Sequence, residues 1–157
     1  MRKFLVLNGP NLNLLGRREP ELYGDITLDE LEDILLTEAE KLKTALECRQ
    51  SNSESQLVDW IHQADDDEIE SVIINPGAYT HTSIALRDAF LATDMHFIEV
   101  HMTNIFAREE FRHKSYLSDI ADATIVGMGF LGYMFALHYA IVGTADPDNL
   151  ANIFEDQ

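Results

Sequence analysis

The sequence predicts an α/β fold in which a five-stranded parallel sheet is covered by helices on both faces. Short, continuous apolar runs alternate along the chain with longer segments whose apolar residues recur at helical spacing. This alternation is typical of strands that are buried on both faces. The 157 residues contain no repeat, linker or low-complexity stretch. We therefore expect one domain over residues 1–157, with an acidic tail of unassigned role from about residue 143.

The first half of the chain predicts two strands and two helices. The apolar run Phe4–Leu7 is a strand that ends where Asn-Gly-Pro follows it. A helix is expected from Thr27 to about Leu46, because apolar residues recur every three or four positions and Glu30 stands in the capping-box position. A weak polar strand follows at about Glu47–Gln50. A second helix is expected over Ser55–Ala64.

The second half repeats the alternation and ends on an apolar helix. Ser71–Asn75 is a strongly apolar strand that Pro-Gly closes. A helix is expected over Thr82–Leu91, capped by one of its first two hydroxyl residues. Phe97–His101 and Thr124–Gly127 are the remaining strands, and Gly132–Val142 is the closing helix.

Five strands in this alternation suit a flavodoxin-like, doubly wound domain, although the pattern does not give the strand order. In open parallel sheets, ligands bind beyond the carboxyl ends of the strands. Three polar segments begin at such ends, namely Asn8–Tyr23, Asn75–His81 and His101–Arg112. We expect them to converge and form the functional site.

Charge and cysteine content exclude several classes of function. The net charge of −17 argues against duplex nucleic acid and anionic membranes as partners. One cysteine cannot form an internal disulfide, and no Cys/His cluster has the spacing of structural zinc ligands. The N-terminal apolar run is too short for a signal peptide, which predicts a cytoplasmic protein.

The arginines indicate a small anionic ligand. Five of them lie in or beside polar loop segments, at positions 17, 18, 87, 108 and 112. Guanidinium groups gathered at loops of an otherwise acidic chain suit an anion. The alternative is that these arginines are ordinary solvated or ion-paired residues.

The first polar segment contains neither GxGxxG nor GxxxxGK[ST], so nucleotide binding is poorly supported. It does place Tyr23 near two arginines, in a loop that could close over a substrate. A free phenol is a poor base at neutral pH, but a close guanidinium stabilises the phenolate, which could then remove a carbon-bound proton. The alternative is a surface turn with incidental Arg and Tyr.

The other two segments add donors and an acid. Asn75 and His81 flank a strand-to-helix turn, where free N–H groups attract anions. Glu99 and His101 are two apart on a strand and so share a face, where the carboxylate favours a protonated imidazole. Such a histidine suits the general acid for a leaving hydroxyl. The alternatives are a capped turn and a structural ion pair.

These residues resemble the type II 3-dehydroquinate dehydratase family. The resemblance covers residues 3 to about 142, with long motifs in order and at the right spacing. The opening motif is Asn8-Gly-Pro-Asn-Leu-Asn-Leu-Leu-Gly with Arg18, Pro20 and Tyr23-Gly24. The further matching segments are Gln50–Glu54, Asp59–His62, Asn75–Ser83, Ala85–Asp88, Glu99–His101, Ala107–Arg112 and Gly127–Tyr133.

The resemblance implies a reversible anti-elimination of water from 3-dehydroquinate to give 3-dehydroshikimate. The reaction would need no cofactor and no metal, would pass through an enolate, and would serve the shikimate pathway to chorismate and the aromatic amino acids, or quinate breakdown. By position, Tyr23 is the base, activated by Arg18, and His101 is the acid, oriented by Glu99. Asn11 helps to hold the enolate.

The resemblance also implies the substrate contacts and the assembly. Asn75 and the Met102–Thr103 segment bind the carboxylate, while His81 and Arg112 bind the ring hydroxyls. Asp88 reaches into a neighbouring subunit's site, in a dodecamer built from trimers. The family usually has Ser where Thr103 stands, which keeps the hydroxyl. Two alternatives stay open: a noncatalytic flavodoxin-like domain that binds FMN, and a lyase for a related cyclic hydroxy acid.

Overall fold

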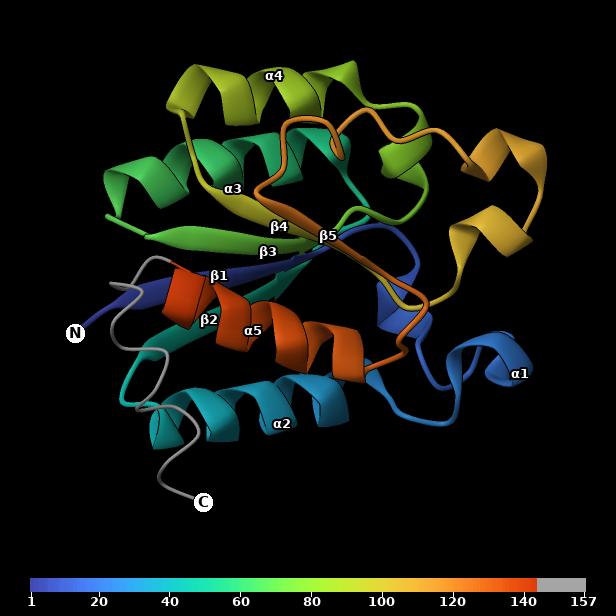
Figure 1. Ribbon diagram of the computed structural model, residues 1–157, viewed down its shortest axis with the longest axis horizontal. Helices are drawn as coiled ribbons and strands as arrows, with labels where there is room; N and C mark the ends of the chain where they lie inside the picture. Colours follow the sequence, from blue (N-terminus) through green and yellow to red (C-terminus); the bar gives the residue numbers. More distant parts are fainter. Residues whose placement is uncertain (144–157) are drawn as a thin grey trace.

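The computed structural model describes residues 1–143, which form the predicted α/β fold around one parallel sheet (Figure 1). The strand order is β2-β1-β3-β4-β5, the flavodoxin-like order that the sequence pattern could not supply. The expected acidic tail follows Gly143 and lies outside the described residues. The strands are β1 (Lys3–Asn8), β2 (Ala45–Gln50), β3 (Ser71–Asn75), β4 (Phe97–His101) and β5 (Ala123–Val126).

Four long helices cover the two faces of the sheet. Figure 1 shows α2 (Leu28–Lys41) and α5 (Leu131–Gly143) on one face, with α3 (Glu54–Asp66) and α4 (Ile84–Thr93) on the other. Side chains of β1 alternate between the two cores. Phe4 and Val6 pack on the side of α2 and α5, and Leu5 and Leu7 pack on the side of α3 and α4. This double burial explains why β1 reads as a continuous apolar run.

The expected N-terminus of α2 is confirmed. The Thr27 hydroxyl accepts a hydrogen bond from the Glu30 N–H, and the Glu30 carboxylate accepts one from the Thr27 N–H at 2.8 Å. These two bonds satisfy backbone donors that a helix start otherwise leaves unpaired.

The expected end of that helix was wrong, because α2 stops at Lys41 and not near Leu46. Lys43 takes a left-handed backbone conformation with φ of +56°, and the Thr44 N–H turns back to the Ala39 carbonyl at 3.0 Å. Leu46 then belongs to β2. Its apolar side chain continued the helical spacing by coincidence, and no Gly or Pro marked the turn.

Five short helical segments lie in the loops, and the sequence pattern did not predict them. They are η1 (Leu12–Leu14), α1 (Pro20–Tyr23), η2 (Gly77–His81), η3 (Ile105–Ala107) and η4 (Glu110–Arg112). All follow the carboxyl ends of β1, β3 and β4, so they build one edge of the molecule. Of the helices in residues 1–143, none has both the length and the apolar character needed to span a membrane.

Candidate active site

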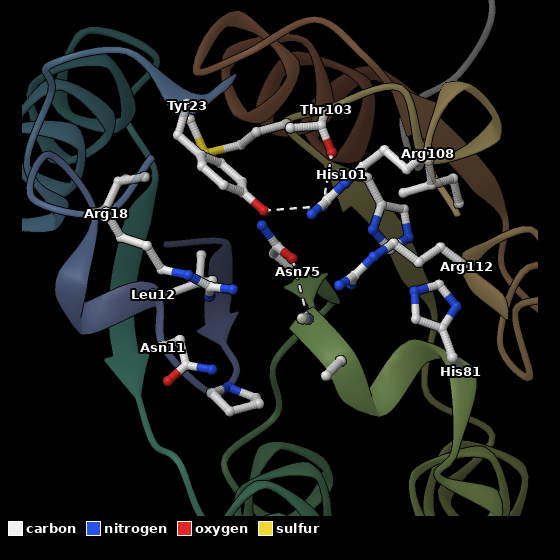
Figure 2. Close-up of a pocket in the computed structure, with 16 residues that line it drawn as sticks. Asn11, Leu12, Arg18, Tyr23, Asn75, His81, His101, Thr103, Arg108 and Arg112 are labelled. Atoms are coloured by element: carbon white, nitrogen blue, oxygen red, sulfur yellow. Dashed lines mark hydrogen bonds between the residues drawn. The ribbon is translucent and has the colours of Figure 1, made fainter. Parts of the chain in front are cut away.

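The three predicted loop segments do converge, at the edge where the parallel strands end. They enclose a pocket with a volume of about 110 Å³. Figure 2 shows its polar side chains pointing toward a common space from the loops after β1, β3 and β4. The predicted site residues that line it are Asn11, Arg18, Tyr23, Asn75, His81, His101, Met102, Thr103 and Arg112.

Two predicted site residues do not line this pocket. Glu99 is fully buried next to His101 in β4. Asp88 is exposed on α4, away from the pocket of its own chain.

Two glycines allow the first two loops to touch. A Cβ at Gly9 would overlap the carbonyl group of Pro76, and the Gly9 N–H donates to the Asn75 carbonyl at 2.8 Å. Gly77 has a φ of +57°, and a Cβ there would lie 3.0 Å from the Pro10 carbonyl oxygen. The close approach of the two backbones is therefore possible only without side chains.

Tyr23 is the last residue of α1, and its hydroxyl is held by an arginine from a different loop. The guanidinium of Arg108 donates to the Tyr23 oxygen at 3.0 Å and lies within 3.5 Å of the Thr103 hydroxyl (Figure 2). The Arg108 side chain is 15% exposed, so water screens this contact little. A phenolate at Tyr23 would be stabilised directly by this cation.

Arg18, the arginine expected to activate Tyr23, lines the same pocket but pairs elsewhere. Its nearest ion-pair contact is with the carboxylate of Glu19, at 3.6 Å. Figure 2 shows the Arg18 side chain entering from the same side of the pocket as Tyr23. Arg18 therefore adds positive charge to the pocket, while Arg108 is the guanidinium bonded to the phenol.

His101 and Glu99 form the expected pair on one face of β4. His101 Nε2 lies 2.8 Å from the Glu99 carboxylate, which also accepts hydrogen bonds from the hydroxyls of Ser115 and Ser118. Burial by itself raises the pKa of the Glu99 carboxyl, but these three hydrogen bonds bring it below its usual value. An ionised Glu99 fixes the imidazole, and only Nδ1 of His101 remains for the pocket.

His81 and Arg112 stand together on the opposite side of the pocket from Tyr23 (Figure 2). His81 Nδ1 lies 2.7 Å from the Lys114 carbonyl, which can only accept, so Nδ1 carries the proton. Burial lowers the pKa of His81, and the nearby charges of His101 and Arg112 act in the same direction. A neutral His81 presents Nε2 as an acceptor, which suits a hydroxyl group.

Asn75 lies at the end of β3 and is hydrogen-bonded on both sides of its amide. Its Oδ1 accepts from the Gly77 N–H at 3.2 Å, and its Nδ2 donates to the Tyr133 hydroxyl at 2.9 Å. Tyr133 comes from α5 and in turn donates to Asn8 at 2.7 Å. Figure 2 shows the Nδ2 end of Asn75 pointing into the space between Tyr23 and His101.

Sequence reasoning gave no site role to Arg108 or Tyr133. The available signal for Arg108 is its place among the loop arginines, in the polar segment His101–Arg112. Tyr133 lies in an apolar helix, and nothing in its neighbours along the chain points to Asn75. Among the described residues, no three His, Cys, Asp or Glu side chains gather closely enough to hold a metal ion.

The amino-acid sequence is similar to a known family and to several named proteins. The family model described as "Dehydroquinase class II" matches residues 2–141. The chain is 57% identical over 147 residues to a protein of Idiomarina loihiensis named "3-dehydroquinate dehydratase", covering 94% of this chain and 97% of that one. A second protein of that name, from Legionella pneumophila strain Corby, is 55% identical over 141 residues, 90% of this chain and 97% of the relative.

Solved structures agree with the sequence comparison. The type II dehydroquinase from Butyrivibrio crossotus superposes with a TM-score of 0.87 at 41% identity, over 88% of this chain and 97% of that chain. At this identity, the likeness extends beyond the arrangement of strands and helices.

Proposed function

Since the chain belongs to the class II dehydroquinase family, whose relatives are 3-dehydroquinate dehydratases, we propose that it dehydrates 3-dehydroquinate reversibly to 3-dehydroshikimate through an enolate. It is accordingly a hydro-lyase. The observation that carries the proposed mechanism is a pair of opposed groups facing one pocket. A phenol bonded to a guanidinium faces an imidazole bonded to a buried carboxylate.

Tyr23 is the proposed base. As a phenolate it removes a proton from the carbon next to the ketone, and the electron pair moves into an enolate. The Arg108 contact at 3.0 Å supports this role because it stabilises the phenolate and aims its oxygen. Arg18, which was expected to activate Tyr23, instead places a second positive charge near the developing negative charge. Asn11 helps to hold the enolate oxygen.

His101 is the proposed acid. The enolate collapses, the carbon–oxygen bond breaks, and the leaving hydroxyl takes the proton of His101 Nδ1 to depart as water. The bond between Nε2 and Glu99 supports this role, because it sets the ring orientation and stabilises the imidazolium. The base takes one proton from the substrate and the acid gives one to the leaving hydroxyl, so the loss of water is complete. No proposed step uses a cofactor or a metal.

The remaining pocket residues bind and orient the substrate. Asn75 and the Met102–Thr103 segment take its carboxylate, and the neutral Nε2 of His81 together with Arg112 takes its ring hydroxyls. The arginines suit an anionic substrate. With its net charge of −17, the chain has no proposed nucleic-acid or membrane partner.

We extend the proposal to the assembly and the setting of the enzyme. The exposed position of Asp88 on α4 suits contact with a neighbouring subunit's site, within a dodecamer of trimers. The reaction serves the shikimate pathway, or quinate breakdown, in the cytoplasm.

The test is the ultraviolet absorbance of purified protein mixed with 3-dehydroquinate, without added metal or cofactor. The product contains a carbon–carbon double bond conjugated with its ketone, so turnover raises the absorbance. A rise that survives a chelator is the expected result. Folded protein that gives no rise would overturn the proposal and favour a related hydroxy acid or a binding role.

A further inference from the structure

A chain of hydrogen bonds runs from the floor of the pocket into the core. Asn75 Nδ2 donates to the Tyr133 hydroxyl at 2.9 Å, and the Tyr133 hydroxyl donates to Asn8 Oδ1 at 2.7 Å. Tyr133 and Asn8 are completely buried, and Asn75 is 6% exposed. Tyr133 belongs to the apolar core between the sheet, α2 and α5. Burying polar groups in such a core costs free energy unless they are paired, so these three linked side chains are candidates for a functional role.

The pocket end of the chain fixes which way the Asn75 amide faces. The Gly77 N–H lies 3.2 Å from Asn75 and can only donate. The oxygen of the amide must therefore face Gly77, and its nitrogen must face Tyr133. One N–H of that nitrogen is used by Tyr133, which leaves the other for a ligand.

The core end fixes the same direction independently. Burial raises the pKa of Tyr133, so its single proton stays on the phenol, and that proton goes to Asn8. The Asn8 Nδ2 group makes no direct hydrogen bond to the described residues. Burial and the charges of Asp29 and Asp33 raise the pKa of the Glu32 carboxyl on α2, and the Asn8 side chain opposes that rise. Because the Tyr133 hydroxyl donates, the group of Asn8 that faces it must be the acceptor Oδ1 and not Nδ2.

We infer that Tyr133, held by Asn8, is a positioning residue of the active site: it orients the Asn75 amide so that an N–H, and not the carbonyl, faces a bound carboxylate. The inference rests on the proposed function, in which Asn75 binds the substrate carboxylate. An amide turned the other way would present an oxygen to an anion and repel it. The contact exists in the ground state and in the transition state alike, so its loss affects KM more than kcat.

The test compares Tyr133→Phe with the wild-type chain in the absorbance assay. Without the hydroxyl, the amide keeps its 3.2 Å bond from the Gly77 N–H but loses the bond that holds its nitrogen, so it is held less firmly. We expect KM for 3-dehydroquinate to rise about 10-fold, as for the loss of one hydrogen bond to a charged group, with kcat changed less than about threefold. Tyr139→Phe is the matched control, because Tyr139 lies on the same helix but is 46% exposed. It should leave both constants unchanged.

A double variant separates positioning from general damage. If Tyr133 acts through Asn75, adding Tyr133→Phe to Asn75→Ala should not raise KM further. Two results would overturn the inference and leave the proposed function intact. One is a double variant whose rise in KM equals the product of the two single rises, and the other is an unchanged KM in Tyr133→Phe. If Tyr133→Phe fails to fold, Asn8→Leu removes the acceptor and must give the same rise in KM. A wild-type chain without turnover would overturn the proposed function, and this inference with it.

Discussion

At the scale of single residues, the proposed chemistry centres on Tyr23. It sits at the end of the four-residue helix α1, whose left-handed start at Glu19 and glycine end at Gly24 aim the side chain inward. Nothing else in the described pocket combines an ionisable oxygen with a bonded guanidinium.

Tyr23→Phe removes the proposed base and should lower kcat by at least about 10²–10⁴-fold, the range for loss of a general base. The substitution deletes one oxygen from a half-buried ring, so the unfolding transition should not change. Steady-state absorbance kinetics, with thermal unfolding alongside, check both points. Near-normal turnover would mean that another group removes the proton.

Arg108→Gln should lower kcat by roughly 10–100-fold, because the phenolate loses the cation bonded to it. Arg17→Gln is the matched control, since Arg17 is exposed and lies outside the pocket. The same assay compares the two variants. Equal activity of both would assign the stabilisation of the phenolate to Arg18, as the sequence first indicated.

Glu99 links stability to pH. Its folded pKa lies below the usual value of 4.5, so its contribution to the free energy of unfolding is fully present above that pH and is lost as pH falls through the folded pKa. Urea unfolding of Glu99→Gln should show a loss of roughly 1–3 kcal/mol at pH 7 and a weaker pH dependence below about 4.5. The exposed Glu40→Gln is the control and should behave as wild type. Identical acid profiles for all three proteins would contradict the role of Glu99.

The residue scale also shows where sequence reasoning stops. Glu99 and His101 could be paired from the sequence because strand spacing places them on one face. Arg108 and Tyr23 are 85 positions apart, and their contact depends on how two loops fold over the sheet edge. The family resemblance implied Arg18 instead, which is five positions from Tyr23 in the sequence.

At the scale of elements, strand and helix positions followed from apolar spacing and capping residues. The end of α2 did not, since a left-handed turn at Lys43 carries no Gly or Pro signal. The strand order did not either, because β1 is apolar on both faces and pairs equally well with any buried neighbour. Polar β2 was expected only weakly, and its half-buried edge position explains its composition.

Gly9→Ala tests the contact between the loops after β1 and β3. The added Cβ would overlap the Pro76 carbonyl, so the two backbones must separate. We expect roughly 1–3 kcal/mol of destabilisation and a fall in kcat/KM of at least about 10-fold, measured by urea unfolding and the absorbance assay. Gly143→Ala is the control, because its Cβ would meet nothing closer than 3.4 Å. A fully active Gly9→Ala would show that this contact does not position the site.

At the scale of the whole molecule, the net charge opposes self-association. The proposed oligomer brings together chains of charge −17, and salt screens such repulsion over about 10 Å at 0.1 M. Light scattering should therefore give a mass many times that of one chain, with more complete assembly at high than at low salt. A monomer at every salt concentration would contradict the homo-oligomer.

The bond between Tyr133 and Asn75 joins two residues that a ribosome adds at widely separated times. Every side chain lining the pocket has been synthesised once Arg112 is added, and β5 and α5 still follow. The tyrosine that supports the floor arrives only with α5, and it bonds back to Asn8, among the first residues made. A nascent chain thus contains every residue that lines the pocket before it contains Tyr133, which holds Asn75. A fragment that ends before α5 would contain all the lining residues but not the hydrogen bond that orients Asn75.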